Sequence, residues 1–313
     1  MLVALAGGIG AARFLQGLVT EVPPETVFIA GNTGDDTEIY GLHISPDLDT
    51  VIYTLAGLAN PLFGWGLAGD TFGCLAALGR LGAETWFQLG DSDLATHIFR
   101  TQRLRSGATL AAVTAEIARS LGVRATVCPA TNDPVRTIVH TPSGRLPFQT
   151  YFVRRHASDR VLRITFSGAR VARPAMPVLK AIRAASGIVF CPSNPFISIG
   201  PILAVPGLRR ALKRRPCPAA AISPIVGGRA IKGPTADMMA SFRLDVSPLG
   251  IARHYRGLID ILVIDRADRE LAPEIERLGI RTVVTNTVMT GIAEKRALAC
   301  ATVQALARHG ARL

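Results

Sequence analysis

Short apolar segments that end in glycine or in a polar turn recur along the chain, and the first two predict how the fold begins. Residues 2–6 (LVALA) run into glycines, and residues 26–32 (TVFIAGN) repeat the arrangement. A short apolar run bounded by turn residues is typical of a strand buried on both faces. Apolar residues between the two runs have the spacing of one helix face: Ala11, Phe14, Leu15 and Leu18. The pattern predicts a strand–helix–strand unit with parallel strands.

The same kind of segment returns four times in the second half of the chain, at residues 187–195, 218–228, 260–266 and 281–287. Segments with helical periodicity alternate with these runs, at residues 201–214, 247–258, 270–278 and 292–309. Strands that alternate with helices form parallel sheets covered on both faces. We therefore predict an α/β fold with a doubly wound, mostly parallel, Rossmann-like sheet.

The middle of the chain has a different pattern. Residues 75–123 are mostly helical, and residues 124–172 contain four short runs separated by turns: RATVCPA, RTIVHT, FQTYFVRR and VLRITFSG. Such alternating runs are typical of antiparallel strands with one exposed face. We predict a single domain over residues 1–313, interrupted at roughly residues 75–175 by an insertion of helices followed by antiparallel strands.

The composition narrows the class of protein. Hydrophobic residues make up 49% of the 313 residues and charged residues 19%, so the chain can bury a large core. No apolar run reaches the roughly 18 residues of a membrane span, and the apolar start lacks the basic flank of a signal peptide. The five cysteines are scattered without a Cys-x-x-Cys spacing, which fits reduced thiols. We expect a cytoplasmic protein without a membrane partner.

The chain is basic, with 35 Lys and Arg against 23 Asp and Glu and a formal net charge of +12. Such a surplus fits either a solvated basic surface or a polyanionic partner. Aromatic residues make up only 6%, and no RNA-binding, zinc-finger or basic-zipper pattern occurs, so we expect no nucleic acid partner.

One stretch departs from the charge of the rest. Residues 29–50 (IAGNTGDDTEIYGLHISPDLDT) hold five carboxylates and no lysine or arginine. Carboxylates gathered after a predicted strand repel one another unless a cation or a proton compensates. Mg²⁺ suits them because it takes oxygen ligands and bridges phosphates, and one carboxylate could instead accept a proton from a hydroxyl group. A solvated acidic loop with helix caps is the alternative.

Three predicted turns have the composition of phosphate-binding loops. Glycines let a phosphate approach the backbone, a helix N-terminus attracts it, and a nearby cation adds charge. The residues with these properties are Gly8, Gly10, Arg13, Ser193, Asn194, Lys232 and Gly233. Each turn also has a structural interpretation, as a tight turn, a helix cap or a surface loop.

Six longer motifs resemble one known family, the 2-phospho-L-lactate transferases. The motifs are LAGGIGAARFLQGL, GNTGDDTEIYGLHISPDLDTVIYTLAG, GWGLAGDTF, WFQLGDSDLATH, CPSNPFISIGPIL and SPIVGGRAIKGPTADMM, in this order over nearly the whole chain. The resemblance implies a step in making the deazaflavin coenzyme F420. A phospholactyl-type group would move from a guanosine diphosphate ester to the ribityl hydroxyl of the deazaflavin Fo, with release of GMP and with Mg²⁺ as cofactor.

The resemblance also implies roles for individual residues. Asp49, in SPDLD, matches a position that binds Fo, and Gln88, in WFQLGD, lies at a second one, where family members often carry a basic residue. We expect Asp49 and Asp36 to be the catalytic candidates. The expected metal ligands are Asp35, Asp36 and Asp47. The expected residues for the donor nucleotide are Gly8, Gly10, Arg13, Asn32, Ser193, Asn194, Lys232 and Gly233.

Two other functions are alternatives. A related group of UDP-sugar-binding regulators, which are not catalysts, shares the early glycine turn and an acidic second loop. A nicotinamide-dependent oxidoreductase would need glycine in place of Arg13 and one acid after the second strand, and the chain has neither. The long acidic motif favours the transferase. Its three-carbon acid, a phospholactyl, phosphoenolpyruvyl or phosphoglyceryl group, is left open, and a homodimer is expected from the frequency of such assemblies.

Overall fold

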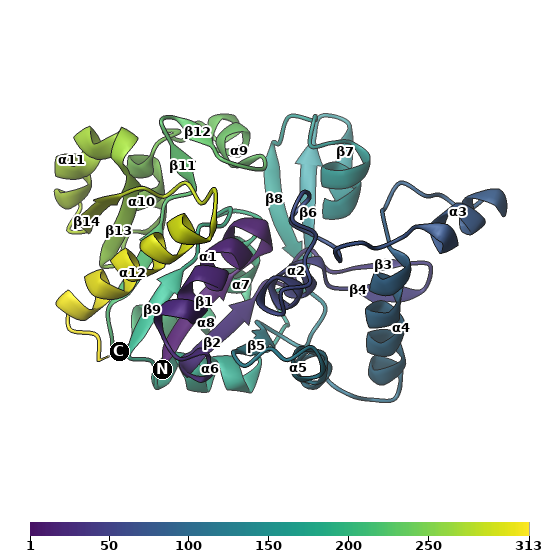
Figure 1. Ribbon diagram of the computed structural model, residues 1–313. Helices are drawn as coiled ribbons and strands as arrows, with labels where there is room; N and C mark the ends of the chain where they lie inside the picture. The colour runs from purple at the N-terminus through teal and green to yellow at the C-terminus, as the bar shows by residue number, and fades with distance from the viewer. Residues whose placement is uncertain (313) are drawn as a thin grey trace.

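A central sheet of seven strands, all parallel, organises the computed structural model, which describes residues 1–312 (Figure 1). The strand order is β14-β13-β10-β9-β1-β2-β5. These strands are β1 (Leu2–Ala6), β2 (Val27–Gly31), β5 (Thr126–Pro129), β9 (Gly187–Phe190), β10 (Ala219–Ile222), β13 (Ile261–Asp265) and β14 (Arg281–Thr285). The predicted α/β fold with a doubly wound parallel sheet is confirmed.

Helices cover both faces of this sheet and bury two separate cores. One face carries α1 (Gly8–Glu21), α2 (Pro46–Leu55), α5 (Leu110–Ser120) and α12 (Ile292–Arg308). The other carries α6 (Met176–Arg183), α7 (Ile199–Ala204), α8 (Leu208–Lys213), α10 (Pro248–Tyr255) and α11 (Ala272–Glu276). Successive side chains of a strand point to opposite faces, so Val3 joins one core and Ala4 the other. This double burial explains why β1 is apolar without a break.

The strand order reverses between β1 and β9, and this reversal positions the site. After β1 the chain continues through α1 on one face, and after β9 it continues through α7 on the other. The two loops therefore diverge at the carboxyl edge of the sheet and leave a crevice between them. Ligands of open α/β sheets bind in such a crevice.

Smaller elements surround this edge. A hairpin of β3 (Thr37–Ile39) and β4 (Leu42–Ile44) precedes α2, and the insertion begins with α3 (Gly73–Arg80) and α4 (Asp91–Arg105). An antiparallel sheet follows, with order β7-β6-β8, formed by β6 (Arg136–Thr141), β7 (Gly144–Pro147) and β8 (Arg163–Ser167). The remaining elements are β11 (Ile225–Val226), β12 (Arg229–Ala230), α9 (Thr235–Ser241) and two 3₁₀ helices, Pro24–Thr26 and Arg266–Leu271. Helices and antiparallel strands occur between residues 75 and 175 as predicted, but β5 in the same range belongs to the central sheet.

The prediction of antiparallel strands is wrong for two of the four runs: one contains a parallel strand and one contains a π-helix. RATVCPA contains β5, which pairs in parallel with β2 at the edge of the central sheet. Val127 and Cys128 are both buried, because the sheet is covered on both faces here. FQTYFVRR contains a π-helix, Thr150–Arg154. Its buried residue Tyr151 and the buried Phe148 just before the helix have helical rather than alternating spacing.

The helix predicted at residues 201–214 is also wrong as a single element. It is divided into α7 and α8, and Gly207 at the start of α8 has φ +92°. A left-handed residue ends helical hydrogen bonding, and glycine adopts this conformation without steric cost. Among the helices of residues 1–312, none is both long enough and apolar enough to cross a membrane.

Candidate active site

A cavity of about 520 Å³ opens at the carboxyl edge of the sheet, where the loops that follow β1 and β9 diverge. This volume is typical of a site for a cofactor-sized ligand. Most predicted site residues line it: Gly8, Gly10, Arg13, Asp35, Asp47, Asp49, Gln88, Ser193, Asn194, Lys232 and Gly233. Asn32 and Asp36 lie outside the lining.

The lining divides into two parts of different chemistry. We call one the glycine half: residues 7–13, 192–198, 223–235 and 287–290, from loops that follow β1, β9, β10 and β14. We call the other the acid half: residues 35–53, 65–66, 87–97 and 148–153, from the segment after β2 and from the insertion.

Close backbone packing shapes the glycine half. A Cβ atom on Gly10 would lie 2.2 Å from the carbonyl oxygen of Pro192, and one on Gly7 would lie 2.6 Å from Cβ of Ser198. The hydroxyl of Ser193 donates to the carbonyl of Gly7 at 2.9 Å, which fixes the two loops against each other. The first turn of α1, with its free N–H groups, consequently faces the cavity.

Two cations of the glycine half, Arg13 and Lys232, lie near a third, Lys295, which is outside the cavity lining and donates to Gln16 of α1. Burial and the nearby charge of Arg13 lower the pKa of Lys232, and both causes also lower the pKa of Lys295 on α12. Lys232 Nζ donates to the carbonyl of Phe63 at 2.9 Å, which connects two loops at the cavity. Like charges held this close favour an anionic ligand, because an anion relieves their repulsion.

Two asparagines that we predicted to contact the donor already make side-chain hydrogen bonds within the protein. Oδ1 of Asn194 accepts hydrogen bonds from the backbone N–H groups of Phe196 and Ile197, at 2.8 and 3.2 Å. Nδ2 of Asn32 donates to Oδ2 of Asp47 at 2.8 Å. Asn32 is fully buried and therefore orients Asp47 rather than facing the cavity.

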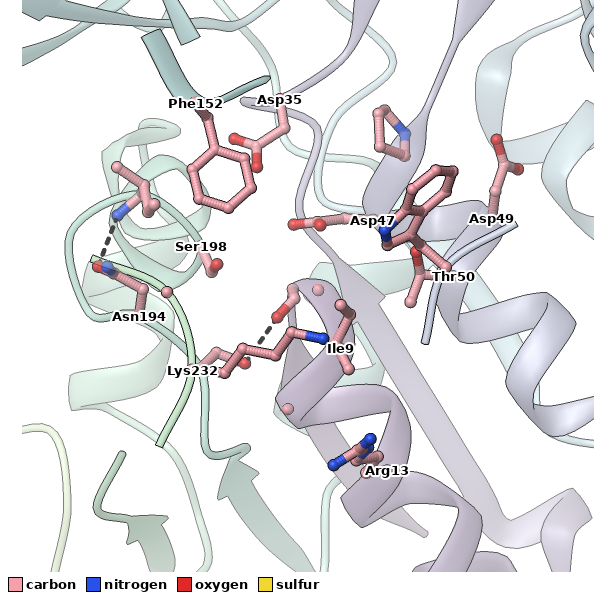
Figure 2. A pocket seen from close by; sticks show the side chains of 18 of the residues that line it. Ile9, Arg13, Asp35, Asp47, Asp49, Thr50, Phe152, Asn194, Ser198 and Lys232 are labelled. Carbon is pink, nitrogen blue, oxygen red and sulfur yellow. Dashed lines mark hydrogen bonds between the residues drawn. The ribbon is translucent and has the colours of Figure 1, made fainter. Parts of the chain in front are cut away.

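Asp35 and Asp47 form a buried carboxylate pair in the acid half. Figure 2 shows both side chains turned toward the same space, with Asp49 turned away from it. Burial, and then the charge of Asp47, raises the pKa of Asp35 well above its usual value. Burial also raises the pKa of Asp47 to about 7. Hydrogen bonds from Asn32 and from the backbone of Gly8 act in the opposite direction and limit this rise. Oδ1 of Asp35 is buried and has no hydrogen-bond partner in residues 1–312.

This pair fits a divalent cation that the substrate helps to bind. Two close carboxylates and an unsatisfied carboxylate oxygen are what a cation would neutralise. Within the described chain, no three His, Cys, Asp or Glu side chains are grouped to hold a metal ion by themselves. Mg²⁺ usually takes one or two carboxylates and completes its shell with water and substrate phosphates, so two carboxylates suffice.

Asp36 has a different environment from its two predicted partners. Its Oδ2 lies 3.1 Å from Nε2 of His43, on the hairpin strand β4. The side chain is buried, but outside the lining of the cavity. Its position favours neither the metal-binding role nor the catalytic role that we predicted for it.

Asp49 lies in the first turn of α2, lines the cavity, and is paired with a residue that the sequence did not indicate. Arg100 on α4 is fully buried; its Nη1 donates to Oδ2 of Asp49 at 3.0 Å, and its Nη2 donates to Oδ1. Burial raises the pKa of Asp49, although the charges of Arg100 and His97 oppose the shift.

A second polar contact joins the same two helices. The hydroxyl of Tyr53 on α2 donates to Oδ1 of Asp93 on α4 at 2.7 Å. His97 lies between the pairs, with Nε2 3.3 Å from Asp93 Oδ1 and Nδ1 3.8 Å from Asp49 Oδ2. Burial by itself would raise the pKa of Asp93. The contacts with His97 and Tyr53 outweigh burial, so the pKa of Asp93 is lowered.

Aromatic side chains form a wall of the acid half. Phe148 and Phe152 stack with ring centroids 5.3 Å apart and planes 12° apart, and Trp65 and Phe87 also line the cavity. Phe152 is 38% exposed, so part of its ring is free to contact a ligand. Gln88 lies in the lining with an exposed side chain. A flat ring system suits this wall, because aromatic rings stack offset or edge to face.

Sequence reasoning missed Arg100, Tyr53 and the aromatic wall. One signal was available, because Asp93, His97 and Arg100 have i, i+4, i+7 spacing and so share one face of a helix. Three polar residues on a buried face need partners. The contribution of Phe152 left no such signal, since its segment was predicted as a strand.

Comparison with known proteins shows the family of this chain and supports the fold. The family model described as 2-phospho-L-lactate transferase CofD matches residues 2–303. A phosphoenolpyruvate transferase of Streptomyces griseus is 41% identical over 304 residues, which cover 95% of this chain and 96% of that protein. A 2-phospho-L-lactate transferase of Methanosarcina acetivorans is 37% identical over 298 residues, which cover 95% and 96%.

A solved structure shares the architecture. The crystal structure of a UPF0052 family protein from Bacillus halodurans superposes with a TM-score of 0.63 at 18% identity, over 96% of this chain and 98% of that one. This similarity shows the fold. The family match and the identity to the two transferases show more: the chain belongs to the 2-phospho-L-lactate transferase CofD family, as its motifs predicted.

Proposed function

We propose that this protein transfers a phospholactyl-type group from a guanosine diphosphate ester to the ribityl hydroxyl of the deazaflavin Fo and releases GMP. One observation carries the proposal. Asp35 and Asp47, a carboxylate pair in need of a cation, share one cavity with the N-terminus of α1 on one side and with Asp49 and an aromatic wall on the other. A metal-assisted transfer between a diphosphate and a ring-bearing alcohol needs these parts together.

The glycine half suits the donor. Backbone N–H groups at the start of α1 can donate to the diphosphate oxygens, and Arg13 and Lys232 supply positive charge from the same side. No side chain separates the backbone of Gly8 and Gly10 from a ligand, so the diphosphate can lie directly against the helix. The loop of residues 287–290 and Ser223 then border the space available to the nucleoside.

The acid half suits the acceptor. The ring of Phe152, backed by Phe148, can stack on the deazaflavin, and the ribityl chain would then extend along the cavity to Asp49. In the reaction the ribityl oxygen forms a bond to the phosphorus that carries the three-carbon acid, and the bond from that phosphorus to the oxygen of GMP breaks. A carboxylate oxygen of Asp49 accepts the proton that the hydroxyl group loses.

Asp35 and Asp47 would hold Mg²⁺, which when bound neutralises charge on the phosphate oxygens. Asn32 keeps Asp47 in place by its hydrogen bond to Oδ2. The backbone amide of Gly8 also donates to Asp47, so the metal site and the donor site share a contact.

The test is turnover of Fo with each candidate donor, followed by mass spectrometry of the product. Donors that carry phospholactyl, phosphoenolpyruvyl and phosphoglyceryl groups are offered separately, because relatives of this chain are named for two of these acids. We expect one donor to give a product heavier than Fo by a phosphoryl group and its three-carbon acid, joined as a phosphodiester, with GMP released in equal amount. EDTA should stop the reaction and Mg²⁺ restore it.

The regulator alternative is tested in the same preparation. If the protein only bound sugar nucleotides, UDP-sugar would raise its melting temperature while Fo and GDP would not, and no donor would give a product. That combination of results would overturn the proposed function.

A further inference from the structure

Arg100 is the largest side chain that is fully buried, and it lies directly behind the acid half. A buried cation is costly unless it is paired and hydrogen-bonded. Both terminal nitrogens of Arg100 bind Asp49, and Nη1 also lies 3.5 Å from the carbonyl of His43 and 3.3 Å from Nδ1 of His97. Two of its five N–H donors therefore serve one carboxylate, and Nε has no hydrogen-bond partner among the described residues.

The pair connects two helices that are distant in sequence. Asp49 and Tyr53 are one turn apart on α2, and they face Arg100 and Asp93 on α4 of the insertion. Buried ion pairs contribute little net stability, and well-packed apolar residues would join the helices as well or better. What an ion pair adds is orientation, because the two N–H groups of the fork fit the two oxygens of a carboxylate.

We propose that Arg100 is a positioning residue whose guanidinium group fixes the carboxylate of Asp49 toward the acceptor's hydroxyl group. The inference rests on the proposed function. A carboxylate has about four lone-pair sites, and the fork occupies two, so Asp49, which lines the cavity, keeps two for a hydroxyl group of the acceptor. Lysine would keep the charge but not the two parallel N–H groups, so it cannot fix the carboxylate plane in this way.

The first test compares Arg100→Lys with Arg103→Lys. Arg103 is also an arginine and lies less than one turn from Arg100 on α4. It makes a bidentate pair with Glu116 as well, but this pair lies on the surface. We expect Arg100→Lys to lower kcat/KM for Fo by roughly 10- to 100-fold, the cost of a small misplacement of a reacting group. The KM for the donor should stay within about two-fold, since donor binding is remote from the pair. Arg103→Lys should change neither.

The second test asks whether Arg100 acts through Asp49. We compare Asp49→Asn with the double variant Asp49→Asn/Arg100→Lys, using kcat/KM and the affinity for Fo from its fluorescence. If Arg100 only positions the carboxylate, the second substitution adds nothing once the carboxylate is gone. Should Arg100→Lys fail to fold, Asp49→Asn/Arg100→Gln replaces the double variant, because it leaves no unpaired charge in the interior.

The outcomes separate cleanly. Equal values for Asp49→Asn and the double variant support the inference. A further loss in the double variant, or an Arg100→Lys protein as active as Arg103→Lys, overturns it while the transferase function stands. A wild-type protein that makes no product with any donor overturns the proposed function, and the inference with it.

Discussion

The two halves of the cavity are built in opposite ways. The glycine half consists of backbone brought together at the end of parallel strands, and two of its glycines, Gly7 and Gly10, leave no room for an added Cβ atom. The acid half consists of side chains from segments far apart in the sequence, such as Asp35 and Phe152. Function of the glycine half should therefore be sensitive to added atoms, and function of the acid half to the removal of charges and rings.

The acid half should show the largest effect, in Asp47→Asn. If the proposed Mg²⁺ binds Asp35 and Asp47, removing one carboxylate weakens its binding and its charge stabilisation, so we expect turnover to fall by roughly 10²- to 10³-fold. Measured kcat with saturating Fo, donor and Mg²⁺ checks this. Asp245→Asn, at a surface ion pair with Arg253, is the matched control and should keep wild-type turnover.

The same variant should be more stable without metal, in a pH-dependent way. Because burial raises the pKa of Asp47 to about 7, the folded protein binds more protons than the unfolded chain between about pH 4 and pH 7. The free energy of unfolding of the wild type therefore falls as pH rises through this window. Asp47→Asn should stabilise the metal-free protein at pH 8 by up to about 4 kcal/mol, at about 1.4 kcal/mol per pKa unit. Urea unfolding at pH 4 and pH 8 measures the difference, and a variant that is less stable at pH 8 would refute it.

The glycine half should respond to Gly10→Ala. The new Cβ would lie 2.2 Å from the carbonyl oxygen of Pro192, which is backbone and cannot rotate away. Accommodating it should cost about 1–3 kcal/mol of stability. Because the loop that moves carries the proposed donor site, we expect donor affinity to fall by roughly 10-fold or more while Fo affinity changes little.

Gly79→Ala is the control for this prediction. Gly79 lies in α3, outside the cavity, and the nearest atom to its Cβ would be a methyl group of Thr85 at 3.3 Å. Alanine favours helices over glycine by about 1 kcal/mol, so this variant should be as stable as the wild type or more so. Calorimetry and titration with GDP and with Fo compare the two variants. Equal loss of affinity for both ligands in Gly10→Ala would contradict the division into halves.

The same difference explains which parts of the site the sequence could predict. Gly8, Gly10 and Lys232 were predicted because the carboxyl ends of buried parallel strands meet at one edge, and apolar runs that end in glycine reveal those ends. The fold followed from the same runs, except where β5 continues the sheet at its edge and where a π-helix replaces an expected strand. Both exceptions depend on burial by distant residues, which local periodicity does not encode.

The acid half could be predicted only in part. The acids around Asp49 were conspicuous because no cation lies near them in the sequence, but their partner Arg100 is 51 residues away. Such a pair forms only once α4 packs against α2, so a local pattern cannot show it. Asp36 illustrates the converse, because its place beside Asp35 in the sequence says nothing of its contact with His43.

The smallest effect should come from the aromatic wall, in Phe152→Ala. Phe152 stacks on Phe148 and is 38% exposed at the cavity. Losing one stacking ring that also remains partly solvated should cost about 0.5–1.5 kcal/mol of Fo binding, a few-fold to roughly ten-fold in affinity. Fluorescence titration of Fo measures it. Phe99→Ala, at a ring that is 40% exposed on α4 but outside the cavity lining, is the matched control and should bind Fo as the wild type does.

Which KM value changes in Phe152→Ala also shows whether the aromatic wall excludes water or stacks on the deazaflavin. If the ring only excludes water, KM for Fo and for the donor should both rise, because an open cavity solvates both substrates. If the ring stacks on the deazaflavin, KM for Fo rises and KM for the donor does not. We expect the second result, because Phe152 belongs to the half of the cavity opposite the cations and helix N-terminus that suit a diphosphate. Equal changes in both KM values would mean that the ring excludes water from the cavity and does not stack on the deazaflavin.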